Sequence, residues 1–313
     1  MRALLLVAFL SAAAAAGAAP QEPRTREDCE RIANYSPSSG QKGKDVVWVP
    51  TKDEAVATML RMAGVGPRDF VIDLGAGDGK IAIAAARAGA RATGIEYNPD
   101  MVRFAQCLVR AEGAAGRASV IEGDIFRYDF SRADVVTMYL LPDLNLCIRH
   151  RVLAMRPGVR VVSNNYHMGE WEADESTVTD EIAVYKWVVP ARVGGLWSFR
   201  PAAGGDASFQ VRLGQAFQKV DGEVDIGGSR HPLLAPALRG DEIRFSFNDG
   251  KGIRRDFTGK VDGREIAGEL RSPALPPVRI VGSLRGAPHA APWAGMAPDC
   301  ESFYAPQTAS RTP

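Results

Sequence analysis

A glycine-rich turn in the first half of the 313-residue chain has the residue types and the spacing of a ligand-binding site. Asp73 ends the apolar stretch "FVID", and Gly75, Gly77 and Gly79 follow it in the pattern D-x-G-x-G-x-G. A buried strand that passes through a glycine turn into a helix is how open α/β proteins bind nucleotide-like ligands. The spacing differs from the G-x-G-x-x-G of dinucleotide-binding proteins, so we expect a ligand without a pyrophosphate.

Two further acidic residues stand where the next two strands are expected to end. Glu96 closes "ATGIE", which is where a carboxylate can accept both hydroxyls of a ribose. Asp124 follows in "VIEGDIF" and is placed to accept from an adenine amino group. Asp73 itself stands where a dehydrogenase normally has glycine. The three acids outline a ligand with an adenosine and a charged amino-acid end, as in S-adenosylmethionine.

The elements that must position these residues are short apolar runs that alternate with runs of helical period. The patterns predict strands at residues 70–74, 92–96, 118–124, 133–141 and 158–164, and helices at 80–89, 99–113 and 142–155. Strands joined by crossover helices form a parallel sheet that is covered on both faces. The predicted fold class is therefore α/β, with a doubly wound Rossmann-like sheet in a domain at residues 46–190.

After Pro190 the pattern changes to short alternating runs separated by Gly, Asp and Asn turns, which is typical of β-hairpins. No helical period occurs between Val193 and Leu284. We expect a second, antiparallel all-β domain at residues 191–286, a barrel or sandwich of about seven or eight strands. Residues 287–313 are rich in Pro and Ala and are predicted to be a tail.

The composition is that of a globular protein, with 46% hydrophobic and 24% charged residues. The net charge is +1, from 38 basic against 37 acidic residues, so no overall basic field would gather nucleic acid or anionic lipid. The four histidines have no metal-ligand spacing, and no structural metal is expected. We expect neither a nucleic-acid partner nor a membrane span after the leader.

The four cysteines form no C-x-x-C motif. Cys107 and Cys147 fall in helical patterns and are predicted to be buried thiols. Cys29 and Cys300 lie near the two ends of the chain, where an oxidising compartment would permit a bond between them. The sequence leaves that pairing open.

The first 19 residues have the features of a signal peptide. Arg2 precedes the apolar run Ala3–Phe9, and Ala16-Gly17-Ala18 resembles a cleavage site. The protein is therefore expected to be exported, to the periplasm or the medium. A wrongly chosen start of a cytoplasmic enzyme and an uncleaved anchor remain as alternatives. Residues 20–45 are polar and are predicted to be a leader or a loosely docked segment.

Three motifs resemble those of the class I S-adenosylmethionine-dependent methyltransferases: "VIDLGAGDGK", "GIEYNP" and "EGDIF". The preceding "VWVPT" is similar to a short element of one branch. That branch includes mitochondrial lysine methyltransferases acting on an ATP synthase subunit and on the adenine nucleotide translocator, besides bacterial proteins. The resemblance covers residues from about 46 to 170 and implies S-adenosylmethionine as the cofactor.

The resemblance also implies roles for individual residues. Asp73 would receive the cofactor's ammonium, Glu96 would hold the ribose, and Asp124 would fix the adenine amino group. The remaining cofactor-binding candidates are Thr51, which would help close the pocket, Gly75, Ala76 and Gly77, whose backbone would pass the methionine part, and Tyr97 and Ile125, which would flank the adenine. For four of these cofactor-binding candidates a structural role is the alternative. Glu96 could be a solvated acid, Asp124 a helix cap, Tyr97 a packing residue, and Thr51 the cap of a "TKDE" capping box with Glu54.

The methyl acceptor is expected at the carboxyl end of the fourth strand, because ligands of open α/β sheets bind off those strand ends. Tyr139 and Asp143 in "TMYLLPDLN" are the catalytic candidates, although Tyr139 also fits a packing role. "SNNYHMGEW" adds Asn164, Asn165 and His167 as rim residues without an assigned role. The adenine methyltransferases of nucleic acids carry N-P-P-Y at this place, and this chain does not, which disfavours base methylation.

Three functions fit these observations. The first is a methyltransferase acting on an amine of a protein or small molecule. The second is an exported, non-catalytic binding protein whose β domain binds a partner, because export separates the protein from the cytosol where the cofactor is made. The third is a nicotinamide-dependent oxidoreductase, which the glycine spacing disfavours.

Overall fold

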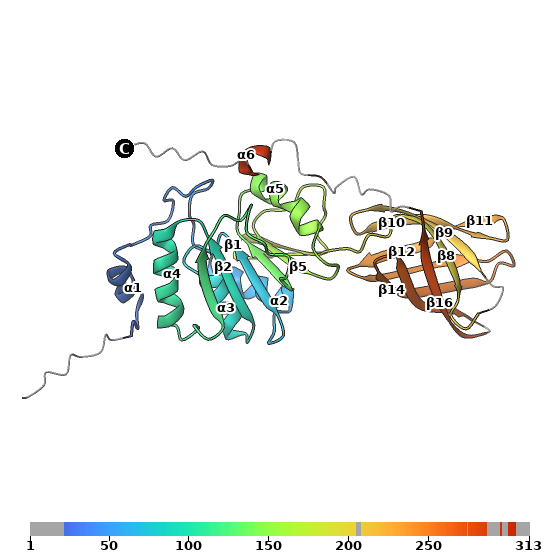
Figure 1. The fold of residues 1–313 in the computed structure, drawn as a ribbon, viewed down its shortest axis with the longest axis horizontal. Coiled ribbons are helices and arrows are strands. Elements are labelled where there is room, and N and C mark those ends of the chain that lie inside the picture. The colour runs from blue at the N-terminus through green and yellow to red at the C-terminus, as the bar shows by residue number, and fades with distance from the viewer. Residues whose placement is uncertain (1–21, 205–207, 274, 287–294, 296–299, 305–313) are drawn as a thin grey trace, which may run out of the picture.

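The computed structural model describes residues 22–204, 208–273, 275–286, 295 and 300–304. The predicted signal peptide and most of the predicted tail lie outside these residues. The chain forms a seven-stranded sheet flanked by helices and a separate nine-stranded sheet, which lie side by side in Figure 1. The predicted fold class is confirmed. Within the described ranges, no helix is long and apolar enough to cross a membrane.

The seven-stranded sheet has the order β3-β2-β1-β4-β5-β7-β6. Five strands run parallel: β1 (Phe70–Leu74), β2 (Arg91–Glu96), β3 (Ala118–Glu122), β4 (Val135–Met138) and β5 (Arg160–Asn164). Two antiparallel strands that the sequence patterns did not reveal, β6 (Glu175–Thr179) and β7 (Ile182–Val188), extend the edge beyond β5. The chain order reverses between β1 and β4, and ligands of open α/β sheets bind at such a switch point.

Helices cover both faces of this sheet, because alternate residues of each buried strand point to opposite sides. Helices α2 (Asp53–Ala63) and α3 (Lys80–Arg87) pack on one face, where Val71, Val135 and Val162 lie. Helix α5 (Pro142–Leu153) packs on the other, which presents Val136 and Val161. Helix α4 (Pro99–Ala111) begins with Pro99 in its first turn, as predicted, and lies against β3.

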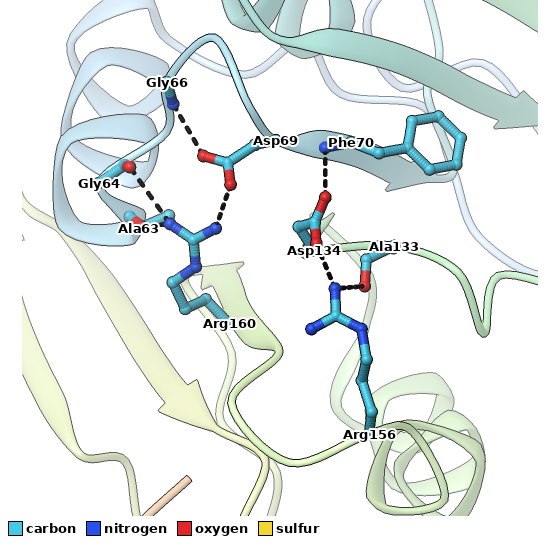
Figure 2. A network of polar contacts seen from close by, with 9 residues as sticks. All are labelled: Ala63, Gly64, Gly66, Asp69, Phe70, Ala133, Asp134, Arg156 and Arg160. Atoms are coloured by element: carbon cyan, nitrogen blue, oxygen red, sulfur yellow. Dashed lines mark hydrogen bonds and ion pairs between the residues drawn. The ribbon is translucent and has the colours of Figure 1, made fainter. Parts of the chain in front are cut away.

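Two arginines fasten the amino ends of the parallel strands (Figure 2). Arg160 donates to the carbonyl of Ala63 at the end of α2 (2.7 Å) and pairs with Asp69 just before β1. Arg156 pairs with Asp134, whose other oxygen accepts from the backbone N–H of Phe70 (2.7 Å). These contacts stabilise the amino ends of the strands. The candidate ligand site lies at the opposite, carboxyl ends.

The second domain is a closed antiparallel sheet around a phenylalanine-rich core. Its strands are β8 (Gly195–Pro201), β9 (Phe209–Ala216), β10 (Lys219–Ile226), β11 (Ser229–Pro232), β12 (Leu234–Arg239), β13 (Glu242–Asn248), β14 (Arg254–Asp262), β15 (Glu265–Ser272) and β16 (Leu275–Arg285). The two ends of the sheet meet, since β10 contacts β12 and β11 contacts β13. The sheet is therefore barrel-like.

The expected number of seven or eight strands is too low, because nine occur among the described residues. The prolines in "SRHP" and "LAPALR" obscured β11 and β12, since proline cannot donate to a strand ladder. The register of β12 shifts between Leu234 and Ala237, at a residue with positive φ, Ala235 (44°). This irregularity breaks the alternating pattern by which strands are found in sequence.

The hairpin turn between β9 and β10 packs against the first domain. Phe217, in this turn, stacks on Trp171 at a ring-centroid distance of 6.1 Å and lies under the guanidinium of Arg149. Lys219 pairs with Glu172 beside it (2.6 Å). The barrel thus contacts the loop that follows β5, on the side where the parallel strands end.

Two disulfide bonds fasten the terminal segments. Cys29, in helix α1 (Arg26–Ala33), bonds to Cys107 of α4, and Cys147 of α5 bonds to Cys300, next to helix α6 (Glu301–Tyr304). The prediction of two buried thiols is wrong, and Cys29 does not pair with Cys300. The bonded cysteines are 78 and 153 residues apart in sequence. Local sequence patterns do not reveal contacts between segments so far apart.

Residues 26–33 are also better ordered than a loosely docked leader. The side chain of Thr25 accepts from the backbone N–H of Asp28, and the carboxylate of Asp28 accepts from the backbone N–H of Thr25. The two bonds form a capping box. The guanidinium of Arg26 lies over the ring of Phe104 on α4, 4.8 Å from its centroid. The segment therefore belongs to the folded body of the first domain.

Candidate cofactor and acceptor site

The glycine turn between β1 and α3 keeps side chains out of the site. Gly75, Gly77 and Gly79 all have positive φ, at 77°, 53° and 79°, a conformation that favours glycine. A Cβ atom on Gly75 would lie 2.9 Å from the side chain of Leu140, and one on Gly77 would lie 2.3 Å from the indole nitrogen of Trp48. The backbone itself therefore forms this wall of the site.

Asp73 lies at the base of the turn and is almost completely buried, with 2% of its surface exposed. Its Oδ1 accepts from the Thr137 hydroxyl of β4 at 2.7 Å. Burial raises the pKa of Asp73 to about 7, the nearby Asp78 and Glu96 carboxylates contribute to the rise, and the Thr137 bond opposes it. No ion pair to Asp73 occurs within the described part of the chain. A buried carboxylate in this setting favours a cationic ligand group, such as the ammonium of an amino acid.

Glu96 is held by the backbone at the end of β2. Its Oε2 accepts from the N–H of Gly77 and its Oε1 from the N–H of Asn98, both at 2.9 Å. Each carboxylate oxygen has a second lone pair that can accept from a further donor. Glu96 is thus fixed in orientation with acceptor capacity remaining, unlike an ordinary solvated acid.

Asp124 has one structural bond and two ion pairs, a close one with Lys44 and a longer one with Arg127 (3.7 Å). Its Oδ1 accepts from the N–H of Phe126 at 2.9 Å in a turn, and because no described helix begins there, the helix-cap alternative is wrong. Its Oδ2 lies 2.9 Å from Nζ of Lys44. Burial by itself would lower the pKa of Lys44, but the Asp124 carboxylate holds it above its usual value. The ammonium of Lys44 also lies 5.1 Å from the ring centroid of Tyr97.

Residues 41–51, which we name the strap, run along the same pocket and all contribute to its lining. The indole of Trp48 lies over the glycine turn, and the backbone carbonyl of Thr51 accepts from Lys80 Nζ at 2.9 Å. Thr51 does not cap helix α2, because Lys52 occupies the N-cap position and makes no side-chain cap bond. The structure therefore places Thr51 in the pocket wall and excludes the capping-box alternative.

One pocket brings together every predicted cofactor residue and one of the two acceptor candidates. Its lining includes Thr51, Asp73, Gly75, Ala76, Gly77, Glu96, Tyr97, Asp124, Ile125 and Tyr139. Sequence reasoning gave no role to Lys44, Trp48 and Lys80, although the last two stand in the quoted motifs, because their places in the pocket follow from how the strap docks.

Asp143 is the predicted site residue that the structure does not bring to the pocket. It lies exposed in the first turn of α5, whereas the next residue, Leu144, points inward and lines the pocket. The helical direction of α5 thus turns the carboxylate away, and the placement of Asp143 at the acceptor mouth is corrected. Of the rim residues, His167 is exposed, while Asn164 is buried.

The residues present fit S-adenosylmethionine. The buried carboxylate of Asp73, which has no ion pair within the described residues, suits the ammonium group. The bare backbone wall suits the methionine part, and the carboxylates of Glu96 and Asp124 suit the adenosine. Among the residues that the structure describes, no group of three His, Cys, Asp or Glu could hold a metal ion.

Comparisons with known proteins agree with this geometry. Residues 73–175 match the family described as the ANTKMT methyltransferase domain. A protein-lysine N-methyltransferase of Saccharolobus islandicus is 39% identical over 133 residues, which are 42% of this chain and 83% of that protein. A Rattus norvegicus protein, named as a lysine N-methyltransferase of an ATP synthase subunit, is 28% identical over 42% of this chain, which spans 60% of the rat protein.

A solved structure is also similar. The chain is 41% identical to an RNA methyltransferase from Salinibacter ruber in complex with S-adenosyl-L-homocysteine, over 46% of this chain and 96% of that one, with a TM-score of 0.46. These matches each cover less than half of the chain. The Saccharolobus relative, of which the chain covers 83%, shows that the chain belongs to the class I S-adenosylmethionine-dependent methyltransferase family. The motifs had predicted this family.

Proposed function

We propose that the protein transfers the methyl group of S-adenosylmethionine to the ε-amino group of lysine in a protein, and that it does so outside the cytosol. The observation that carries the proposal is the pocket in which Asp73, Glu96 and Asp124 surround a bare glycine turn beside Tyr139. Two relatives, one named as a protein-lysine N-methyltransferase and one as a lysine N-methyltransferase of an ATP synthase subunit, support a lysine acceptor.

Each carboxylate has a part of the cofactor to hold. Asp73 would bind the ammonium and Glu96 the ribose hydroxyls, since its backbone bonds leave one lone pair free on each oxygen. Asp124 would accept from the adenine amino group. Bound in this way, the cofactor presents a methyl group on a positively charged sulfur, which is electrophilic without further activation.

The remaining task of the protein is to position the acceptor. Aligning two reactants can lower a barrier by ~7–11 kcal/mol relative to the reaction of free molecules. Tyr139 follows β4 directly and lines the cofactor pocket, so an acceptor beside its ring would lie close to the bound cofactor.

The acceptor amine reacts through its lone pair and must therefore be unprotonated. Burial raises the pKa of Tyr139, and the neighbouring Tyr166 contributes to the rise. The phenol thus stays neutral at ordinary pH and is no general base. The proton of the acceptor ammonium is expected to leave to solvent.

Export is supported by the cysteines. Both pairs form disulfides in the described structure, and such bonds persist in oxidising compartments. The signal-peptide pattern at residues 1–19 supports the same location. N-terminal sequencing of the protein from its host tests export: a chain that begins near Ala19 is expected, and an intact Met1 in the cytosolic fraction would contradict it.

The activity is tested with methyl-labelled S-adenosylmethionine and two acceptor pools, exported proteins and total RNA from the host. We expect label on protein lysine, located by mass spectrometry of peptides, and none with Asp73→Asn. Label confined to RNA, or absent from both pools, would overturn the proposed acceptor.

A further inference from the structure

Asn164, the last residue of β5, carries a buried amide without a hydrogen-bond partner. Its side chain is 1% exposed, and neither Oδ1 nor Nδ2 has a partner within the described part of the protein. Buried amides are normally bonded, because an unsatisfied one loses its bonds to water without replacement. The amide therefore has hydrogen-bonding capacity left for a group from outside the chain.

The sheet register places Asn164 beside the acceptor candidate of β4. Met138 pairs with Ser163 in the parallel ladder, so the next residues of the two strands, Tyr139 and Asn164, are neighbours. Tyr139 lines the cofactor pocket. The amide therefore lies at the carboxyl ends of β4 and β5, where open α/β sheets bind their ligands.

Strand alternation gives the face on which the amide lies. Val162, two residues before Asn164, packs on the face covered by α2 and α3. On the same face, Thr137 of β4 donates to Asp73 of β1. Because residues i and i+2 of a strand share a face, Asn164 is on the side of the sheet that holds the Asp73 carboxylate.

Two aromatic rings accompany the amide. Tyr139 and Tyr166 stack with their ring centroids 6.3 Å apart and their planes at 25°. Tyr166 is fixed next to the strand end, because its N–H donates to the carbonyl of Asn164 at 2.9 Å and Asn165 between them has a positive φ of 66°. Tyr139 is thus next to Asn164 in the sheet register and Tyr166 follows it by two residues, and we refer to these three residues as one cluster.

A second buried asparagine, Asn145 of α5, holds the far side of this cluster. Its Nδ2 donates to the hydroxyl of Ser163 (3.2 Å) and to the backbone carbonyls of Tyr166 (3.2 Å) and His167 (3.4 Å). Nδ2 of Asn145 is therefore engaged in fixing the loop after β5, whereas both amide atoms of Asn164, like Oδ1 of Asn145, have no partner in the described part of the chain. The pair offers a matched comparison of two buried amides with different tasks.

We propose that Asn164, Tyr139 and Tyr166 form the subsite for the acceptor side chain, an unbranched primary amine such as that of lysine. Oδ1 of Asn164 accepts an N–H of the amine and so orients its lone pair, while the tyrosine rings contact the methylene chain. This inference rests on the proposed function and deepens it.

The step that the subsite serves is balanced within the two substrates. The lone pair of the neutral amine forms the new N–C bond to the methyl carbon, and the C–S bond breaks with its electron pair left on sulfur. The nitrogen of the product is a substituted ammonium, whose proton passes to solvent. Asn164 neither gives nor takes a proton and acts by positioning.

The test compares Asn164→Leu with Asn145→Leu and the wild type. Calorimetry measures the binding of n-butylamine, which has the chain of a lysine side chain, to protein saturated with S-adenosylhomocysteine. Kinetics with a lysine-containing peptide give KM and kcat, and the thermal midpoint reports stability. We expect Asn164→Leu to weaken n-butylamine binding and kcat/KM for the peptide tenfold to a hundredfold, with S-adenosylhomocysteine affinity within about twofold.

Stability separates the proposed role from a structural one. Because leucine removes an unsatisfied buried amide, the midpoint of Asn164→Leu should not fall, whereas Asn145→Leu loses bonds and its midpoint should fall. Unchanged n-butylamine binding in Asn164→Leu, or no binding by the wild type, would overturn the subsite. Wild-type binding that Asn164→Leu loses, without methyl transfer to any lysine, would instead refute the proposed function and leave the subsite standing.

Discussion

The ammonium of Lys44 lies 2.9 Å from the carboxylate of Asp124, the residue that the motifs assign to the adenine amino group. The same ammonium lies 5.1 Å from the ring centroid of Tyr97, which the resemblance places against the adenine. Lys44 thus occupies the surroundings expected for the base. Since it belongs to the strap, cofactor entry and movement of residues 41–51 should be linked.

Replacement of Lys44 tests this link. Lys44→Met removes the ammonium that pairs with Asp124, so we expect S-adenosylmethionine to bind about threefold to tenfold more tightly by calorimetry, a gain of roughly 0.7–1.4 kcal/mol. Lys42→Met, in the same strap, is the control and should bind as the wild type does. A loss of affinity in Lys44→Met would mean instead that the lysine holds the strap closed over the ligand.

The burial of Asp73 predicts a pH dependence of cofactor binding. Its folded-state pKa is about 7, so the carboxylate is protonated below that pH and must ionise before it can pair with an ammonium. Affinity for S-adenosylmethionine should rise with pH up to about 7, by as much as tenfold per unit, and level off above it. A titration series from pH 5.5 to 8.5 measures this slope, and Asp73→Asn should bind weakly with no such slope.

The same group should make the ligand-free protein less stable at higher pH. The folded state holds the Asp73 proton from the ordinary value of 3.8 up to about 7, whereas the unfolded state has released it. Stability therefore falls as pH rises through this window, at up to ~1.4 kcal/mol per unit. Asp73→Asn should lack this part of the loss, so its midpoint at pH 8 should equal or exceed that of the wild type; a large drop would contradict the buried charge.

The network at the amino ends of the strands should affect stability without affecting ligand binding. Arg160→Met deprives the Ala63 carbonyl and Asp69 of their donor, and we expect a loss of ~1–3 kcal/mol by thermal unfolding. The exposed pair between Arg103 and Asp100 provides a control, since Arg103→Met should be nearly neutral. Weakened cofactor affinity in Arg160→Met would contradict the separation of the two ends of the sheet.

Local patterns were sufficient to predict the parallel core and a set of residues that line one pocket. Strand period, the glycine turn and Pro99 at a helix start are properties of neighbouring residues, and the structure has β1, α3 and α4 where these signals lie. Glu96 and Asp124 could be placed because the carboxyl ends of parallel strands meet at one edge of a sheet.

The features that could not be predicted depend on contacts between distant segments. Lys44 reaches Asp124 across 80 residues, and Cys147 reaches Cys300 across 153. Asp143 was placed wrongly because the packing of α5 turns Leu144 into the pocket and leaves Asp143 exposed, although the helix begins at Pro142 as predicted. The burial of Asn164 follows from packing that no periodicity specifies.

The most direct test of the central claim is a calorimetric titration of S-adenosylmethionine into the wild type and into Glu96→Ala, with NAD as the competing ligand. Charge-assisted bonds to the ribose are worth roughly 1.5–3 kcal/mol, so Glu96→Ala should bind about tenfold to a hundredfold more weakly, while its ligand-free thermal midpoint stays close to that of the wild type. Glu96→Gln should be intermediate. Tight NAD binding by the wild type with no response to S-adenosylmethionine, or equal affinities of the wild type and Glu96→Ala, would contradict the account.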